Sequence, residues 1–190
     1  MREIITAIQN WNRIKIDAAA LQDLFDNKRG FVLNYGLFPS DSPLHAYAAI
    51  KNNVFGFYII AESDDVKSDD ATLAKNIHWH PCISVLQEDQ EITEKEALLR
   101  IDDWEKLRNE WIDNKIKLDG ALYQSFYIPT TDLHDERYMV YFGLKNHASK
   151  ALLKDADLVL KNQSNLYFDT IRLQPPYPIK MEAYYLLELV

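Results

Sequence analysis

Residues 45–60 read HAYAAIKNNVFGFYII, and this stretch decides which class of fold to expect. Two apolar runs, 45–50 and 54–60, lie on either side of Asn52 and Asn53. Asparagine tolerates positive φ, which the tight two-residue turns of β-hairpins require. We therefore predict two antiparallel strands joined by a turn at these two asparagines.

Most of the remaining chain also favours strands. Further candidates, each bounded by polar or turn-forming residues, are 31–35, 77–86, 123–128, 137–144, 166–173 and 183–190. We expect 123–128 and 137–144 to form a second pair across the polar loop 130–136. Within 137–144 apolar residues occupy both odd and even positions, so both faces of the strand carry them. This suits a sheet that is packed on both faces.

Two helices are predicted from their ends. Asp17 suits an N-cap, Ile16 and Leu21 fall at hydrophobic-staple positions, and Gly30 lies beyond the last turn as a terminating glycine. A longer helix, from about Thr93 to 118, begins with a capping box formed by Thr93 and Glu96. The residues that recur along it at helical spacing should form a packed face: Ala97, Leu98, Ile101, Trp104, Leu107, Trp111 and Ile112. Residues 148–160 are ambiguous, and we expect the first half to be helical.

Strands that form hairpins without regular β-α-β alternation indicate an α+β fold. We expect mostly antiparallel sheets of about six to eight strands, with two to three helices packed on one side. No Pro/Gly/Ser-rich linker divides the chain, so residues 1–190 are predicted to form a single globular domain. The hydrophobic share of 47% and charged share of 26% are ordinary for such a domain.

Charge and cysteine usage narrow the classes of partner. The formal net charge is −8, and basic residues are scattered among acidic ones, so we expect neither nucleic acid nor an anionic membrane as a partner. No apolar run approaches the ~18 residues of a membrane span, and no secretory signal is seen. The single Cys82 cannot form an intramolecular disulfide and suits a reducing, cytoplasmic compartment. We interpret it as a small buried hydrophobe.

The common catalytic and nucleotide-binding motifs are absent from the sequence. The five glycines, at 30, 36, 56, 120 and 143, form neither a dinucleotide-binding turn nor a phosphate loop. The Gly-x-Ser-x-Gly elbow, the His-Glu-x-x-His motif and any Cys-x-x-Cys pair are also missing. A catalytic site defined only by geometry remains open.

The segment His78-Trp79-His80-Pro81-Cys82 is the candidate metal site. On a strand, His78 and His80 share a face, and Cys82 could supply a third ligand to zinc or a similar transition metal. A further ligand could come from elsewhere in the chain: His45, His134, Asp135, Glu136 or His147. The simpler interpretation, which we favour, is that both histidines are half-buried packing residues and that no cofactor is bound.

Two polar stretches have a simple structural interpretation. Residues 62–70 (ESDDVKSDD) lack the ligand spacing of a calcium loop, and we predict a solvated loop. Residues 174–178 (QPPYP) contain a Pro-x-x-Pro spacing that could dock on a partner, but a rigid connector is the better interpretation.

The functional hypothesis is a non-enzymatic protein-binding or assembly module that works through protein contacts and self-association. The chain has eleven tyrosines and four tryptophans, which are favoured at interfaces because one edge packs while the other stays wet. The last segment, 184–190, would invite pairing if it were an edge strand, because it is apolar. The alternative is a small-molecule or metal-dependent enzyme that uses His78 and His80.

Overall fold

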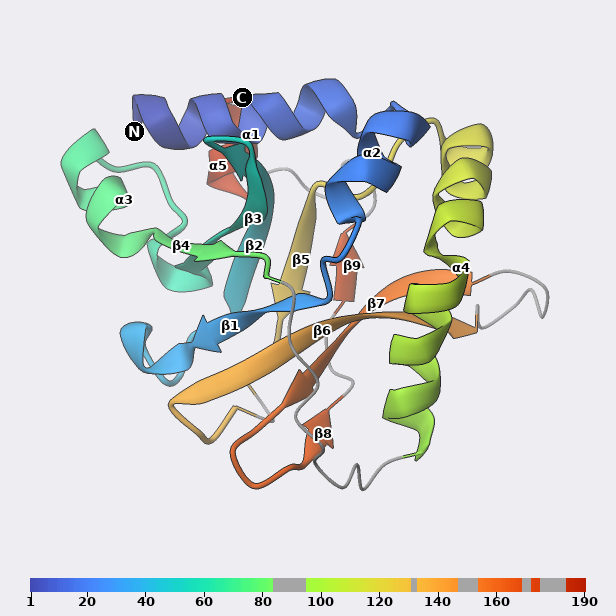
Figure 1. Ribbon diagram of the computed structural model, residues 1–190. Helices are drawn as coiled ribbons and strands as arrows, with labels where there is room; N and C mark the ends of the chain where they lie inside the picture. Colours follow the sequence, from blue (N-terminus) through green and yellow to red (C-terminus); the bar gives the residue numbers. More distant parts are fainter. Residues whose placement is uncertain (84–94, 131–132, 147–153, 169–171, 175–183) are drawn as a thin grey trace.

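A computed structural model describes residues 1–83, 95–130, 133–146, 154–168, 172–174 and 184–190 (Figure 1). The helices in these residues are α1 (Arg2–Ile14), α2 (Ala18–Phe25), α3 (Asp70–Asn76), α4 (Lys95–Asp119) and α5 (Tyr185–Glu188), with 3-10 turns at Tyr35–Leu37 and Glu62–Asp64. The strands are β1 (Gly30–Asn34), β2 (Leu44–Lys51), β3 (Val54–Ala61), β4 (His78–Pro81), β5 (Ser125–Ile128), β6 (Arg137–Asn146), β7 (Lys154–Lys161), β8 (Tyr167–Phe168) and β9 (Arg172–Gln174). The α+β class is confirmed, with slightly more helices than predicted.

The described strands form two antiparallel sheets. One has the order β4-β3-β2-β5-β9, and the other has the order β1-β6-β7-β8. A single bridge between Gly30 and Ile83 connects the start of β1 to the residues just after β4. The main hydrophobic core collects side chains from both sheets, so the two sheets pack around a shared interior.

The predicted hairpin is confirmed as β2 and β3. Lys51 pairs with Val54, and the two asparagines between them have φ angles of 51° and 63°. The second predicted pair is wrong, because β5 joins β2 and β9 whereas β6 joins β1 and β7. The alternation of side chains fixes which faces a strand buries, but it does not choose the neighbouring strand.

The period of two along β2 sends side chains to two different cores. Leu44, Ala46 and Ala48 face the main core between the sheets. Tyr47 and Ala49 face a second core, which α1 and the C-terminal residues cover on the outer side of the five-stranded sheet. Figure 1 shows α1 lying across this sheet, with α5 beneath it.

The two predicted helices are present, with corrected ends. Asp17 caps α2 by accepting from the backbone N–H groups of residues 19 and 20, each at 3.1 Å. The staple is wrong, because Ile16 is 57% exposed. Gly30 does not terminate the helix either; it begins β1, and Asn27 adopts the positive φ that follows α2.

Helix α4 packs its tryptophan face inward, as predicted. Trp104 and Trp111 are buried, and the Trp104 ring lies 5.2 Å from the ring of Phe142 on β6. Gly120 follows the helix with a φ of +81°, which suits glycine after a helix end. Thr93, the proposed cap, lies outside the described residues.

The C-terminal strand prediction is wrong. Residues 185–188 form the short helix α5, and Leu186 is buried in the outer core. The argument for self-association through an edge strand at 184–190 therefore no longer holds. Helices α1 and α3 were not predicted, and residues 148–153 lie outside the described part of the chain. Among the described residues, no helix is long and apolar enough to cross a membrane.

Candidate functional site

The predicted metal ligands lie on and just after β4, at the edge of the five-stranded sheet. His78 and His80 share a face, and both rings pack on Phe38, at 5.2 and 6.1 Å between centroids. Cys82 is buried in the main core, and this burial raises the pKa of its thiol well above the ordinary value. The two imidazoles therefore have an aromatic neighbour in common.

Burial also governs the chemistry of His80. It lowers the pKa of the imidazole to about 4, so the ring is neutral near pH 7. Nδ1 lies 3.2 Å from the carbonyl oxygen of His78, whereas Nε2 has no hydrogen-bond partner among the described residues. In the described part of the chain, no group of three His, Cys, Asp or Glu side chains is placed to hold a metal ion. His147 lies outside that part, and the metal site stays a prediction.

A second group of titratable residues, which the sequence did not single out, lies on the outer face of the same sheet. We call it the His45 cluster: His45 and Tyr47 of β2, Asp65, and Tyr184 before α5, with Glu62 at its rim. The side chains of His45 and Asp65 are 1% and 0% exposed.

Local structure explains how Asp65 reaches this cluster. Strand β3 ends at Ala61, and the 3-10 turn Glu62–Asp64 reverses the chain. The N–H of Asp65 donates to the carbonyl oxygen of Ala61 at 3.0 Å, which holds the residue over the sheet. The prediction of a solvated loop for 62–70 is therefore wrong at Asp65. It is also wrong at its end, where Asp69 caps α3.

The Asp65 carboxylate accepts three hydrogen bonds from different parts of the fold. Oδ2 accepts from His45 Nδ1 at 2.7 Å and from the hydroxyl of Tyr47. Oδ1 accepts from the backbone N–H of Leu186 at 3.3 Å. These donors compensate the cost of burying a carboxylate, and the carboxylate in turn fixes the tautomer and orientation of the His45 imidazole.

The outer side of the His45 ring faces Glu62 and Tyr184. Nε2 of His45 lies 4.0 Å from Oε1 of Glu62, whose side chain is 43% exposed. The Tyr184 ring stacks on the imidazole, with 4.1 Å between centroids and 27° between planes. Burial raises the pKa of Tyr184, and burial followed by the Asp65 charge raises that of Tyr47.

An aspartate that orients a histidine through Nδ1 also occurs in hydrolytic triads, where Nε2 must reach the substrate. Here Tyr184 covers the imidazole, so Nε2 does not meet solvent. The contacts of the cluster instead join β2, the segment after β3 and the C-terminal residues. These contacts hold residues 184–190 against the sheet.

The main core contains a cavity of about 30 Å³ lined mainly by aromatic rings. One of these rings is that of Trp104, whose Nε1 has no hydrogen-bond partner within the described residues. Cavities that bind benzene measure roughly 150 Å³, and ligand pockets roughly 300–1,000 Å³. The cavity is therefore a packing void and not a small-molecule site.

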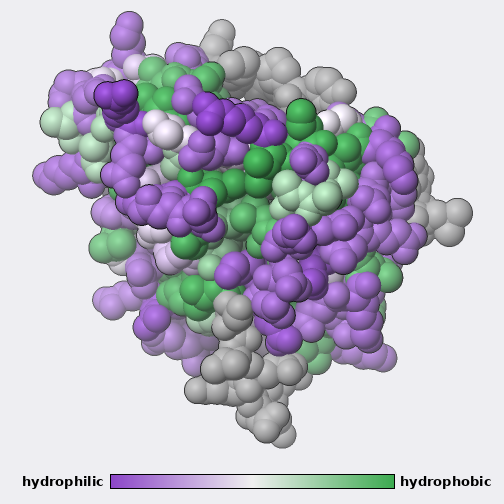
Figure 2. Space-filling model, turned by 45° about the horizontal axis from the view of Figure 1, so that its top comes forward, coloured by the Kyte–Doolittle hydropathy of each residue, from purple (hydrophilic) through white to green (hydrophobic). Residues whose placement is uncertain are grey.

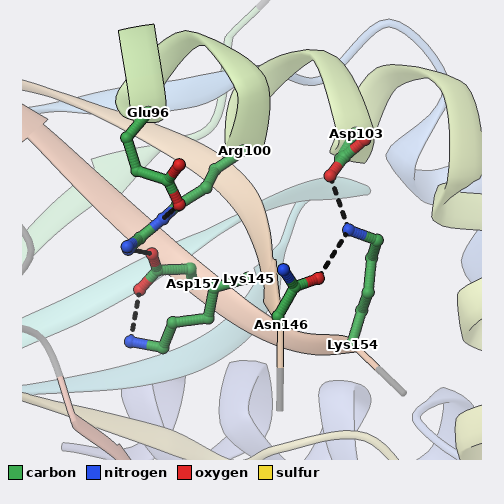
Figure 3. A network of polar contacts seen from close by, with 7 residues as sticks. All are labelled: Glu96, Arg100, Asp103, Lys145, Asn146, Lys154 and Asp157. Atoms are coloured by element: carbon green, nitrogen blue, oxygen red, sulfur yellow. Dashed lines mark hydrogen bonds and ion pairs between the residues drawn. The ribbon is translucent and has the colours of Figure 1, made fainter. Parts of the chain in front are cut away.

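Asp157 of β7 is the centre of a polar network that fixes α4 to the four-stranded sheet (Figure 3). Its carboxylate accepts from Arg100 of α4 at 2.8 Å and from Lys145 of β6 at 3.1 Å. Beside it, Lys154 donates to Asp103 at 2.6 Å. These pairs hold helix to sheet, and we assign them a structural role.

The surface offers one further feature, at the corner where α1 meets α2. Ile16 at this corner is 57% exposed, and Leu118 near the end of α4 is 65% exposed. No other large hydrophobic side chain described is more exposed than these two. We call them, with the exposed Ala19, the corner patch.

Contacts along the two helices place the start of α2 beside the end of α4. Asp26 pairs with Arg108, and Gln22 with Asp113, so α2 runs antiparallel to α4. The carbonyl oxygen of Lys15 then accepts from the N–H of Leu122 at 3.0 Å. Ile16 lies between Lys15 and Gln22 in the sequence, and Leu118 lies between Asp113 and Leu122. Both therefore belong to the same end of the helix pair. Figure 2, which turns the α1 side of the molecule forward, shows apolar surface gathered among hydrophilic residues.

Comparison with known proteins adds no relative, because no protein family, no curated protein and no solved structure matches this chain.

The His45 cluster could have been suspected only in part from the sequence. His45 and Tyr47 alternate on a predicted strand, so they had to share a face. Asp65 looked like one more acidic residue in a polar stretch, and no local pattern marks a carboxylate that folds back onto the sheet. The sequence did not mark the corner patch, because Ile16 was expected to be covered as a staple residue.

Proposed function

We propose that this chain is a non-enzymatic assembly domain that binds a second copy of itself through the corner patch. The observation that supports this proposal is that its two most exposed large apolar side chains among the described residues, Ile16 and Leu118, both lie at the end of the α2–α4 pair where α2 begins. Exposed apolar residues scattered singly are normal, whereas grouped ones mark interaction surfaces.

The charges around the corner patch suit a contact between identical surfaces. The exposed Asp17 and Lys117 carry opposite charges on α2 and α4. In a dimer with a two-fold axis, both copies use the same surface. A residue away from the axis then faces a different residue of that surface in the partner. Opposite charges within one patch can therefore face each other across the axis, although each chain has a net charge of −8.

The buried polar groups also favour a binding role over catalysis. His45 and Asp65 bond to each other beneath Tyr184, and His80 is buried against aromatic rings. The alternative, an enzyme using His78 and His80, therefore has less support than self-association. A reducing cytoplasmic compartment, which we also propose, suits the buried Cys82 thiol.

The test is the molar mass in solution, measured by light scattering over a range of protein concentrations. The molar mass of the wild type should rise with concentration from that of one copy to that of two. The molar mass of the double variant Ile16→Glu/Leu118→Glu should remain that of one copy. The matched control is Val66→Glu/Leu99→Glu, which adds the same charge at side chains that are 53% and 51% exposed elsewhere. A wild-type chain that stays monomeric, or a control that dissociates equally, would rule the proposal out.

A further inference from the structure

Residues 184–190 occupy a binding site that other parts of the fold form. We call this site the seat, and it consists of His45, Asp65 and the outer core. Tyr184 stacks on His45, and the N–H of Leu186 donates to Asp65. The Leu186 side chain is 1% exposed. It lies in the outer core with residues of α1, β2 and β3, among them Ala7, Ile8, Tyr47, Ala49 and Ile60.

Contacts from outside residues 184–190 also hold the polar part of this seat. Asp65 is fixed by His45 and Tyr47 of β2 and by its own N–H, which donates to Ala61. Of the hydrogen bonds to Asp65 within the described residues, the one from Leu186 comes from the C-terminal segment. A carboxylate oriented in this way is pre-organised to accept a backbone N–H, which lowers the ordering cost of binding.

The segment that fills the seat has little structure of its own. Helix α5 has four residues, too few to be stable in isolation. Within 184–190 Tyr184 and Leu186 are fully buried, and Tyr185, Leu187, Leu189 and Val190 pack partly against the outer core. The gain from burying these side chains and the entropy lost on ordering seven residues are of similar size. The segment should therefore leave and rebind readily.

We propose that this seat is a recognition site for a short peptide, and that residues 184–190 of a second copy bind there in exchange for the chain's own. The required chemistry is an aromatic ring for the face of His45, a leucine two positions later for the outer core, and the backbone N–H of that leucine for Asp65. This exchange uses a surface that does not include Ile16 or Leu118, so it is independent of the corner patch.

The test uses the full-length chain and a labelled synthetic peptide with the sequence of residues 184–190, followed by fluorescence anisotropy. In the wild type, residues 184–190 of the chain itself compete with the labelled peptide for the seat. The variant Leu186→Asp weakens that segment and should bind the peptide at least about tenfold more tightly, since apparent affinity scales with the fraction of open seats. The same peptide carrying Leu186→Asp should not bind.

Two further variants make the result decisive. Tyr184→Ala opens the same seat without placing a charge in the core, and it replaces Leu186→Asp if circular dichroism shows that variant to be unfolded. A chain carrying Leu118→Glu should bind the peptide as the wild type does, which separates this result from the test of the corner patch. Folded variants that bind the peptide no better than the wild type would overturn the proposal.

Discussion

Nδ1 of His45 lies 2.7 Å from Oδ2 of Asp65, and both side chains are sealed from solvent. The two residues are 20 positions apart and reach each other because β3 returns alongside β2. The same carboxylate bonds Leu186, which is 121 positions further along the chain. One buried carboxylate therefore joins a hairpin to the C-terminal helix.

Asp65→Asn should cost about 3–5 kcal/mol of unfolding free energy, because removing one partner of a buried, bonded pair leaves the others without compensation. An amide can accept at only one of its two terminal atoms, so a donor among His45, Tyr47 and Leu186 must lose its bond. Urea denaturation measures the change. The neighbouring Asp64→Asn is the control and should shift stability by no more than about 0.5 kcal/mol. Equal effects of the two substitutions would contradict the central role of Asp65.

Truncation of either core tryptophan should strongly lower the free energy of unfolding. Trp104→Ala and Trp111→Ala should each cost about 3–5 kcal/mol, because each removes a large buried side chain. The more delicate comparison uses phenylalanine. Nε1 of Trp111 donates to the carbonyl oxygen of Lys154 at 2.8 Å, whereas Nε1 of Trp104 has no partner in the part of the chain that the structure describes.

Trp111→Phe should therefore cost about 1 kcal/mol more than Trp104→Phe, the usual net value of one hydrogen bond. Chemical denaturation of the two variants under the same conditions gives the difference directly. A larger loss for Trp104→Phe would show that its indole N–H has a partner in solution.

Gly30 should tolerate no side chain. A Cβ at this position would lie 1.8 Å from the carbonyl oxygen of Val140, since β1 and β6 approach closely there. Gly30→Ala should therefore force the two strands apart and lower the melting temperature strongly. At Gly36 an added Cβ would meet its nearest atom at 3.6 Å, an ordinary contact, so Gly36→Ala is the matched control and should melt near the wild type. Similar melting of the two variants would argue against the close pairing.

Local patterns predicted those parts of the fold that depend on neighbouring residues. The Asn52-Asn53 turn, the Asp17 cap and the tryptophan face of α4 each depend on spacings of a few residues. The partners of β5 and β6 were predicted wrongly, because strand pairing is decided by contacts distant in sequence. The segment 184–190 has strand-like composition, yet Leu186 bonds to Asp65 and not to a sheet, since strand propensity yields to context.

The candidate site shows the same division between local and distant information. That His78 and His80 share a face follows from the two-residue period of a strand, and the structure agrees. Their common neighbour Phe38 lies 40 or more positions earlier in the sequence, so the aromatic surroundings were not foreseeable. Asp65 was assigned to a solvated loop because its burial depends on His45, Tyr47 and Leu186 together.

His80 should make the protein sensitive to mild acid. Its pKa in the folded protein is about 4, lowered by burial from the ordinary value of 6.5. Between these values the unfolded chain binds a proton that the folded chain does not, so stability falls as the pH is lowered through this window. The slope should be about 1.4 kcal/mol per pH unit from this residue alone.

Carboxylates also titrate in this window, so the measurement is a difference between two chains. His80→Phe keeps a ring against Phe31 and Phe38, and it has no proton to gain. Unfolding free energies from urea titrations at several pH values between 4 and 6.5 should fall more steeply for the wild type than for this variant. His134→Phe, at an exposed histidine, is the control and should keep the wild-type slope. Parallel slopes for the wild type and His80→Phe would mean that His80 becomes protonated in the folded protein as readily as in the unfolded chain.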